Sequence, residues 1–426
     1  MEAMTLKGIR VVECATGWVG PWAGMILANM GAQVIKVEST RAMDMTRSGV
    51  ATSQLARGLY PDGNPGERPW NRHRRFVSSN LGKCDVTLDI TRPEGYEVLM
   101  RLVRVSEVFI TNMVPTTVEK LGLSYDDLIK VKPDLVYAAA SGFGTESPYR
   151  SRVVMGNTID AYSGMLGLRD YGDGDSTSVS ASTHCDSIGA ASLAFAVMIG
   201  LYHKRSTGRG TCVVVPIVGA AMTHIGEAFV QYSMDGQVPR SSGNKDVRFV
   251  QGCYPCAGND EWVTISVRTD EEWAALQRAL GNPLELQRAE LSDPIGRLRN
   301  QASIDHAIGA WTSTHTKQES MLLLQQLCVP AGAVYNYQDV YSDDHLRETE
   351  FWETIACSEV GTHVYPGRPW RLSSSKAAPR SCPPGLGEHN HYVLGEIAGL
   401  TNQEVEALES LGITGTTPER RSPTKQ

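Results

Sequence analysis

Residues 6–38 read LKGIRVVECATGWVGPWAGMILANMGAQVIKVE, and their pattern decides the fold. Ile9–Val12 and Gln33–Glu38 are short runs rich in β-branched residues, which is typical of strands. Pro21–Met30 lies between them, and it is apolar with proline in its first turn, which is typical of a helix. A strand, a helix and a second strand in this order predict a βαβ unit with parallel strands.

The same alternation continues along the chain. Further strands are expected at 107–111, 135–140 and 212–215, and a long apolar helix is expected from Asp186 to Lys204. Two helix starts, Thr91-Arg-Pro-Glu94 and Thr269-Asp-Glu-Glu272, have the spacing of a capping box. Helices that alternate with short apolar strands predict a Rossmann-like α/β fold around a parallel sheet.

A change of pattern near residue 239 indicates a second domain. The runs 252–255 and 262–265 look like antiparallel strands. We therefore expect a large Rossmann-like domain built from both chain ends, 1–220 and 330–426, and a small α+β domain from 225 to 329. The polar tail, 415–426, is expected to be disordered.

Composition narrows the function classes. A net charge of -7 with 20% charged residues gives no reason to expect nucleic acid as a partner. Nine scattered cysteines favour a reducing compartment, so we expect a cytoplasmic protein without disulfides. The most apolar run, Ala190–Tyr202, is shorter than the roughly 20 residues that span a bilayer, so we expect no membrane segment.

Two short motifs have more than one interpretation. Gly17, Gly20 and Gly24 follow the first strand at the first, fourth and eighth positions, whereas a dinucleotide fingerprint needs the first, third and sixth, so NAD binding is disfavoured. Cys253-Tyr-Pro-Cys256 lacks a second pair that would complete a zinc site, which favours structural cysteines and no metal.

The long stretch between Ser39 and Asp85 is rich in arginine. Guanidinium groups suit phosphate oxygens, and a solvated loop has the same composition, so both interpretations stay open. The arginines are Arg41, Arg47, Arg57, Arg68, Arg72, Arg74 and Arg75.

Asp186 lies in THCDSIGA, residues 183–190, at the start of the expected apolar helix. From the residues alone, an aspartate there is an N-cap.

Several segments together resemble the class III CoA transferases of the CaiB/BaiF type, which include formyl-CoA:oxalate and crotonobetainyl-CoA:carnitine CoA-transferases. The resemblance spans nearly the whole chain. It is carried by Leu6–Val12, Gly20-Pro21, Gly31–Glu38, Val86–Asp89, Leu121–Leu123, Ser141–Gly144, Thr207–Gly210 and Gly387–Asn390 with Val393-Leu394. It implies an enzyme that moves CoA from an acyl-CoA donor to a carboxylic acid acceptor, with a CoA thioester as substrate and no permanently bound cofactor.

The resemblance also implies site residues. Asp186, which follows Ser163-Gly164, fills the position of the nucleophile that forms an aspartyl mixed anhydride and then an aspartyl-CoA thioester. The loop Gly243-Asn244 is the candidate oxyanion-binding loop. The matching CoA-binding positions are Trp18, Val19, Leu88, Asn112, Val114, Lys120 and Met155. Ser39 stands where formyl-CoA transferase has an arginine that contacts CoA.

The residue at position 155 distinguishes CoA transfer from a related reaction, racemisation. The 2-methylacyl-CoA racemases share the fold and need a histidine base at the position of Met155, a substrate-site position that here holds a thioether. Transfer is therefore favoured over racemisation, with a racemase or isomerase and a non-catalytic acyl-CoA-binding protein as alternatives. The resemblance further implies a homodimer of two interlocked subunits.

Overall fold

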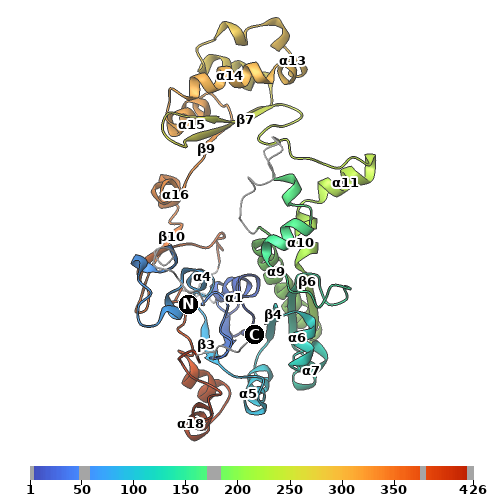
Figure 1. Cartoon of the computed structure of the whole chain (residues 1–426), viewed down its shortest axis with the longest axis vertical. Helices are drawn as coiled ribbons and strands as arrows, with labels where there is room; N and C mark the ends of the chain where they lie inside the picture. The colour runs from blue at the N-terminus through green and yellow to red at the C-terminus, as the bar shows by residue number, and fades with distance from the viewer. Residues whose placement is uncertain (1–3, 48–57, 170–183, 375–379, 420–426) are drawn as a thin grey trace, which may run out of the picture. The chain divides into compact units, whose positions relative to one another are not determined.

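The computed structural model describes residues 4–47, 58–169, 184–374 and 380–419. The chain divides into two compact units. Unit 1 contains Met1–Met165, Ala181–Val230 and Phe351–Gln426, and unit 2 contains Leu166–Ser180 and Gln231–Glu350. In Figure 1 the blue part of the chain belongs to unit 1, and the yellow part with most of the orange belongs to unit 2.

Unit 1 is built on a six-stranded sheet in which every neighbouring pair is parallel. The strands lie in the order β3-β2-β1-β4-β5-β6, so the order reverses between β1 and β4. Val12 of β1, for example, pairs with Ile35 of β2 and with Phe109 of β4. The strands are β1 (Arg10–Cys14), β2 (Gln33–Glu38), β3 (Cys84–Thr87), β4 (Val108–Thr111), β5 (Val136–Ser141) and β6 (Thr211–Pro216). The predicted parallel α/β sheet is confirmed.

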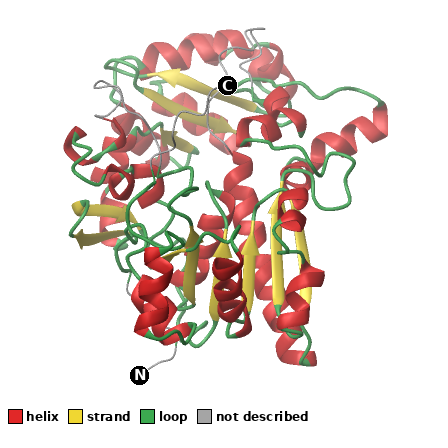
Figure 2. Cartoon of the chain, turned by 60° about the horizontal axis from the view of Figure 1, so that its bottom comes forward, coloured by secondary structure: helices red, strands yellow, loops and turns green. Residues whose placement is uncertain are grey.

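Helices cover both faces of this sheet (Figure 2), because successive strand residues point to opposite sides. Val11 belongs to one apolar core and its neighbour Val12 to the other. The first core is closed by α1 (Val19–Asn29), α8 (Gly156–Tyr162), α9 (His184–Thr207) and α10 (Ile217–His224). The second is closed by α5 (Pro93–Arg104), α6 (Pro115–Lys120), α7 (Tyr125–Val131), the π-helical η5 (Tyr392–Ile397) and α18 (Asn402–Ser410).

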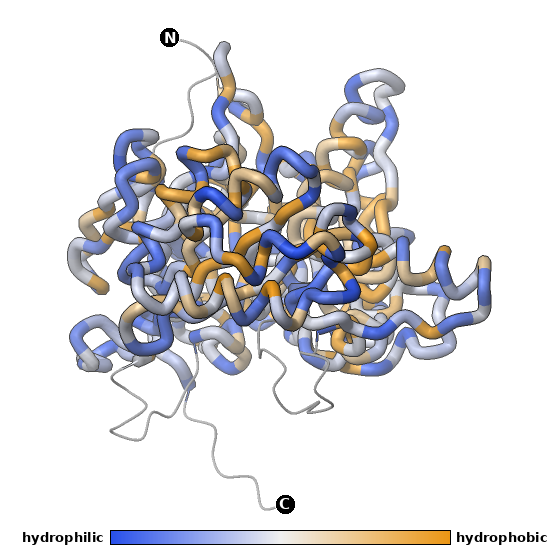
Figure 3. The backbone as a smooth tube through the Cα atoms, turned by 90° about the horizontal axis from the view of Figure 1, so that it is seen from above, coloured by the Kyte–Doolittle hydropathy of each residue, from blue (hydrophilic) through white to orange (hydrophobic). Residues whose placement is uncertain are grey.

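Shorter elements complete unit 1. They are the 3-10 turn η1 (Pro61–Gly63), α3 (Pro69–Arg72), α4 (Arg74–Val77) and the antiparallel hairpin β10 (Trp352–Cys357) and β11 (Gly361–Pro366). The helix α11 (Gly226–Asp235) begins in unit 1 and ends in unit 2. Hydrophobic (orange) and hydrophilic (blue) residues alternate along the described tube in Figure 3, as expected of elements with one buried side.

Unit 2 has an antiparallel sheet of β7 (Val250–Pro255), β8 (Trp262–Val267) and β9 (Ala331–Ala333), in that order. Its core gathers apolar residues such as Val263 and Leu276. Its helical elements are η2 (Leu166–Leu168), α12 (Asp270–Ala279), η3 (Leu284–Leu286), η4 (Ala289–Leu291), α13 (Pro294–Arg299), α14 (Gln301–Thr312), α15 (Lys317–Gln326), α16 (Tyr337–Ser342) and α17 (Asp344–Glu348). Because β9 pairs with β8, it belongs to this sheet, and by contacts unit 2 extends to Glu350, whereas the sequence indicated a small domain from 225 to 329.

The two capping predictions have different outcomes. Thr269 caps α12 in a complete capping box with Glu272, which confirms the prediction. The prediction for Thr91 is wrong, because α5 begins at Pro93 with Arg92 as its N-cap. The Thr91 hydroxyl instead donates to Asp89 Oδ1 over 2.5 Å.

The C-terminal tail is ordered as far as Glu419, so the expectation of disorder is wrong for residues 415–419. The Gly415 N–H donates to Thr87 Oγ1 over 2.9 Å, and the Glu419 N–H donates to the Thr40 carbonyl over 3.0 Å. These contacts hold the tail along the ends of β2 and β3. The rest of the predicted tail, 420–426, lies outside the described residues.

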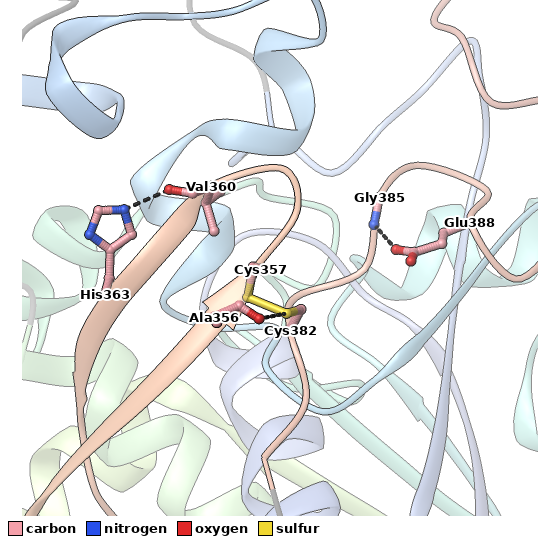
Figure 4. The surroundings of a disulfide bond; sticks show 7 residues. All are labelled: Ala356, Cys357, Val360, His363, Cys382, Gly385 and Glu388. Atoms are coloured by element: carbon pink, nitrogen blue, oxygen red, sulfur yellow. Dashed lines mark hydrogen bonds between the residues drawn. A yellow bond between two sulfur atoms is a disulfide. The ribbon is translucent and has the colours of Figure 1, made fainter.

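The expectation of no disulfide is also wrong. Cys357, at the end of β10, is bonded to Cys382 with their Cα atoms 5.6 Å apart (Figure 4). The β10–β11 hairpin brings Cys357 beside the segment that returns to the sheet, where Gly82 N–H donates to the Ser381 carbonyl over 3.1 Å. Cysteine spacing alone does not reveal such a pairing.

Among the described residues, one helix, α9, is long and apolar enough to cross a membrane by length and composition. It is longer than the apolar run seen in the sequence, at 24 residues. One side of it packs in the unit 1 core through Leu193, Ala194 and Val197, which is also typical of a core helix.

Candidate active site

The strand order places a crevice at the carboxyl ends of β1 and β4, where ligands bind in open α/β sheets. The loops after these strands are locked together by one side chain. Asn112 Oδ1 accepts from the Thr16 N–H over 2.9 Å, and Asn112 Nδ2 donates to the Thr16 carbonyl over 2.6 Å. Asn112, a predicted CoA-binding position, therefore shapes the floor of this crevice.

Packing explains the glycine pattern after β1. Gly17 has φ +79°, and its N–H donates to Asp44 Oδ1 over 3.2 Å. A Cβ on Gly24 would lie 1.9 Å from Glu13 Oε2, so a side chain there would displace a buried carboxylate. Gly17 therefore allows the turn of the loop after β1, and Gly24 leaves room for the buried carboxylate of Glu13.

A cavity of about 810 Å³ opens beside these loops in unit 1. Leu88, a predicted CoA-binding residue, lies in its wall. Two other wall residues adjoin predicted positions, because Met113 lies between Asn112 and Val114 and Leu121 follows Lys120. The wall thus combines apolar side chains with a few charged ones, as ligand pockets commonly do.

The remaining predicted CoA-binding residues flank this region on two helix ends. Trp18 precedes α1 and stacks on Trp22 with ring centroids 5.5 Å apart, and Val19 is buried. Val114 is the N-cap of α6, and Lys120 is the exposed last residue of the same helix.

Asp186 lies in the first turn of α9, partly exposed. The helix begins two residues earlier, at His184, so Asp186 is inside the helix and not at the N-cap position. The positive end of the helix dipole favours a carboxylate in this turn.

The neighbouring residue, Cys185, fixes this turn. Its N–H donates to Asp160 Oδ1 over 3.1 Å, and its thiol donates to the Gly156 carbonyl over 3.0 Å. Burial, and then the negative charges of Asp186 and Asp160, raise the pKa of the Cys185 thiol. The Cys185 thiol is therefore held in its neutral, weakly reactive form beside the carboxylate of Asp186.

Unit 1 brings several predicted site residues to one corner. Gly189 is one turn after Asp186, and a Cβ there would lie 3.4 Å from Val19 Cγ1. Met155 is the exposed N-cap of α8 and precedes Gly156, which accepts the Cys185 thiol.

Gly243 and Asn244 belong to unit 2. Gly243 has φ +63° and its N–H donates to Ser241 Oγ over 3.1 Å, while the Asn244 carbonyl accepts from Gln251 Nε2 over 3.4 Å.

A group of buried charges beneath the crevice was missed by the sequence reasoning. Lys36 Nζ is 2.7 Å from Asp44 and 3.3 Å from Glu13, and Lys83 Nζ is 2.8 Å from Glu13. We call the group the inner ion network, and it consists of Glu13, Lys36, Glu38, Asp44, Arg47, Lys83 and Asp85. All seven side chains are buried. Glu38 and Asp44 also line the cavity, so the network supports its wall.

Arg47 is the second centre of this network. Its Nε is 2.8 Å from Glu38, its Nη2 is 3.3 Å from Asp85, and its guanidinium lies 3.5 Å above the Phe76 ring. Its Nη2 also donates to the Pro384 carbonyl over 3.0 Å.

Burial and neighbouring charges shift the pKa values of three groups of the network in different directions. Burial and the charge of Glu38 raise the pKa of Asp85 well above its usual range, against the effect of Arg47. Burial alone would raise the pKa of Asp44, but Lys36 outweighs it and lowers that pKa to about 2. Burial lowers the pKa of Lys83 to about 8 against the attraction of Glu13. The pKa of Asp85 is thus raised while that of Asp44 is lowered, so two carboxyls of one network respond to their surroundings in opposite directions.

The other arginines of the basic stretch have mixed environments. Arg68 and Arg72 contact Glu359, through its carboxylate and its carbonyl respectively. Arg74 and Arg75 are exposed, and Arg57 lies outside the described residues. Arg41 lines the cavity.

Comparison with known proteins now identifies the family. The model of CoA-transferase family III matches residues 6–390, which is most of the chain. The chain belongs to CoA-transferase family III. The predicted family and enzyme class are thereby confirmed.

Relatives of this family III CoA-transferase match along nearly their whole lengths. The succinyl-CoA–D-citramalate CoA-transferase of Chloroflexus aurantiacus is 26% identical over 95% of this chain and 97% of its own. The formyl-CoA:oxalate CoA-transferase of Streptomyces coelicolor is 29% identical over 97% of this chain and 100% of its own. A crystal structure of a CaiB/BaiF family protein from Brucella suis superposes with a TM-score of 0.82 at 25% identity, covering 92% of this chain and 99% of the other.

Proposed function

We propose that this family III CoA-transferase uses Asp186 as its nucleophile and transfers CoA between two carboxylic acids. The observation that carries the proposal is the position of Asp186. It lies in the first turn of α9, partly exposed, one turn before Gly189, where a Cβ would lie 3.4 Å from Val19 Cγ1 at the start of α1.

The reaction proceeds in two mirrored halves. An Asp186 carboxylate oxygen attacks the thioester carbonyl, the C–S bond breaks, and CoA leaves as a thiolate with a mixed anhydride behind it. The thiolate then attacks the Asp186 carbonyl carbon, which releases the donor acid and forms an aspartyl-CoA thioester. The acceptor carboxylate attacks this thioester and regenerates an anhydride and the thiolate. Attack of the thiolate on the acceptor acyl carbon yields the new acyl-CoA and free Asp186.

The surrounding residues have proposed roles in holding CoA and the oxyanions. The cavity beside Leu88 would take part of the CoA nucleotide, with Trp18, Asn112 and Lys120 around its approach. N–H groups of the Gly243-Asn244 loop would donate to the tetrahedral oxyanions.

A homodimer in the cytoplasm is part of the proposal. Apolar side chains on the outer side of α9 and on α11 support it, because an exposed apolar patch marks an interaction surface. They are Phe195, Ile199, Tyr202, Phe229 and Val230, all in unit 1.

The alternatives are weaker for specific reasons. Racemisation needs a base at the position of Met155, and the exposed thioether of Met155 does not ionise. A non-catalytic acyl-CoA-binding protein has no need of a carboxylate in the first turn of α9.

The test is CoA exchange measured by mass spectrometry with a panel of donors and acids. Succinyl-CoA and formyl-CoA are the first donors, because relatives are named for them. Asp186→Asn should lower the exchange rate by at least about 10³-fold, since the amide is not a nucleophile. Asp126→Asn is the matched control, because Asp126 is an exposed aspartate in the first turn of α7 and should leave the rate unchanged.

The covalent intermediate gives a second readout. Hydroxylamine added with acyl-CoA should convert Asp186 alone to a hydroxamate, which peptide mass spectrometry detects. Wild-type exchange by Asp186→Asn, or labelling at another residue, would show that the nucleophile is assigned wrongly.

A further inference from the structure

One arginine of the cavity wall is held by an acid from the far end of the chain. Arg41 Nε is 2.8 Å from Glu419 Oε2, and Arg41 Nη1 is 3.3 Å from Asp89 Oδ2. All three residues line the cavity. We call Arg41, Asp89 and Glu419 the outer clasp.

The other acids of the cavity wall are engaged elsewhere. Glu38 pairs with Arg47 and Asp44 with Lys36, both inside the inner ion network. Asp89 also accepts from the Thr91 hydroxyl and the Thr91 N–H, over 2.5 Å and 3.2 Å. Of the two wall carboxylates that pair with Arg41, Glu419 is therefore the closer and the more exposed one.

Glu419 reaches Arg41 because the tail lies along the end of β2. Its N–H donates to the Thr40 carbonyl over 3.0 Å, and its Oε1 is 3.5 Å from Thr40 Oγ1. These are one backbone hydrogen bond and one long side-chain contact, so little free energy opposes the release of Glu419.

The clasp is open to water. The side chains of Arg41 and Glu419 are 53% and 41% exposed. An ion pair this exposed is weak, so a better anion can replace the carboxylate. Phosphate is such an anion, because the planar guanidinium donates two parallel hydrogen bonds to its oxygens and phosphate carries more charge.

We propose that Arg41 binds a phosphate group of the CoA nucleotide and that Glu419 is an internal competitor, which this phosphate displaces. The proposal rests on the proposed function, because that function supplies the phosphate-bearing ligand. According to this proposal, the segment that carries Glu419 is part of the substrate site. Glu419 lines the cavity in the free enzyme and leaves Arg41 when CoA binds.

The test is a double-mutant cycle on CoA affinity, measured by calorimetry with the full-length chain at one ionic strength. Glu419→Gln should tighten CoA binding about two- to fivefold, because the competitor loses its charge. Arg41→Gln should weaken it about tenfold, because a charge-assisted hydrogen bond is lost. In the Arg41→Gln background, Glu419→Gln should have no further effect.

Matched controls separate the clasp from general charge effects. Arg74→Gln removes an exposed arginine of the same stretch, and Glu406→Gln removes an exposed glutamate of α18. Neither residue lines the cavity, and both variants should bind CoA as wild type does.

Ligand variants identify the phosphate. Pantetheine has no phosphate, so its affinity should be the same in wild type and in all variants. Dephospho-CoA lacks only the 3′-phosphate. If its affinity is unaffected by Arg41→Gln, then Arg41 binds the 3′-phosphate, and if it falls as for CoA, then Arg41 binds the diphosphate.

Two results overturn the proposal while the proposed function stands. One is CoA binding by Glu419→Gln that equals wild type, and the other is an equal loss of CoA and pantetheine binding by Arg41→Gln. A wild-type chain that binds no CoA at all overturns both the proposal and the proposed function.

Discussion

Two arginines six residues apart in one loop meet opposite environments. Arg47 is in the inner ion network, where its side chain and those of its partners Glu38 and Asp85 are at most 2% exposed. Arg41 is in the outer clasp, where its side chain is 53% exposed. Both pair with carboxylates at similar distances, from 2.8 to 3.3 Å.

The difference shows that burial, and not the ion pair itself, separates scaffold from ligand site. A buried guanidinium cannot leave its partners without leaving charges in a medium of low dielectric constant. An exposed one exchanges partners at little cost because water screens both states. The inner ion network therefore holds the cavity wall in place, and the outer clasp is available to a ligand.

The largest expected effect comes from breaking the inner network at Arg47. Arg47→Gln leaves Glu38 buried without its main counter-charge, so we expect a loss of about 3–5 kcal/mol in the free energy of unfolding. Urea unfolding followed by circular dichroism measures this loss. Arg41→Gln is the control, and equal losses from the two variants would refute the contrast between the two arginines.

Removal of the Cys357–Cys382 disulfide is expected to have the next largest effect on stability, and it acts on the inner ion network alone. Cys382 is two residues before Pro384, whose carbonyl accepts from Arg47. Cys357→Ser with Cys382→Ser opens a loop of sequence separation 25, and loop-closure entropy predicts a loss of about 3 kcal/mol. Addition of a dithiol reductant to wild type should lower the urea midpoint as much as the double substitution does. The midpoint of the double variant should not respond to the reductant.

Acid should act on Asp44 in a defined direction. Its pKa is about 2 in the folded chain against an ordinary 3.8, so its ionised form stabilises the fold above about pH 4. This contribution, about 2 kcal/mol, is lost as the pH falls from about 4 to 2. Urea midpoints at a series of pH values should therefore fall less steeply for Asp44→Asn than for wild type over this range.

The contribution of Asp85 to stability should change with pH in the opposite direction to that of Asp44. Its pKa is raised, so its contribution to stability is complete below 3.8 and is lost as the pH rises towards its folded pKa. Relative to wild type, Asp85→Asn should become less destabilising as the pH rises above about 4. A pH dependence of the same sign for Asp44→Asn and Asp85→Asn would contradict the opposite pKa shifts of these two carboxyls.

The sequence predicted the sheet because hydrophobic periodicity determines it. Strands such as Val136–Ser141 are buried on both faces and read as continuous apolar runs. Thr269 was predicted correctly as a cap because its partner Glu272 is in the same turn. The same pattern failed at Thr91, because Asp89, from outside the helix, takes its hydroxyl.

The environments of the charged residues could not be predicted from hydrophobic periodicity. Lys36 lies in a strand, and hydropathy favours an exposed position for a lysine, yet it is fully buried by Asp44 and Glu13 from separate segments. Asp186 has no local signal that separates a nucleophile from a helix cap, so its role came from the family resemblance. Such assignments depend on contacts between distant segments, which periodicity does not encode.

The smallest expected effect on stability belongs to Arg41. Arg41→Gln breaks only exposed contacts, so we expect a change below about 1 kcal/mol in the free energy of unfolding, similar to that of Arg74→Gln. The same variant should lose about tenfold in CoA affinity, because phosphate binding uses the guanidinium directly. A loss above about 2 kcal/mol would place Arg41 with Arg47 in the scaffold, and its effect on CoA would then follow from a deformed cavity. Stability and affinity measured on one protein preparation therefore decide whether the two arginines differ in role.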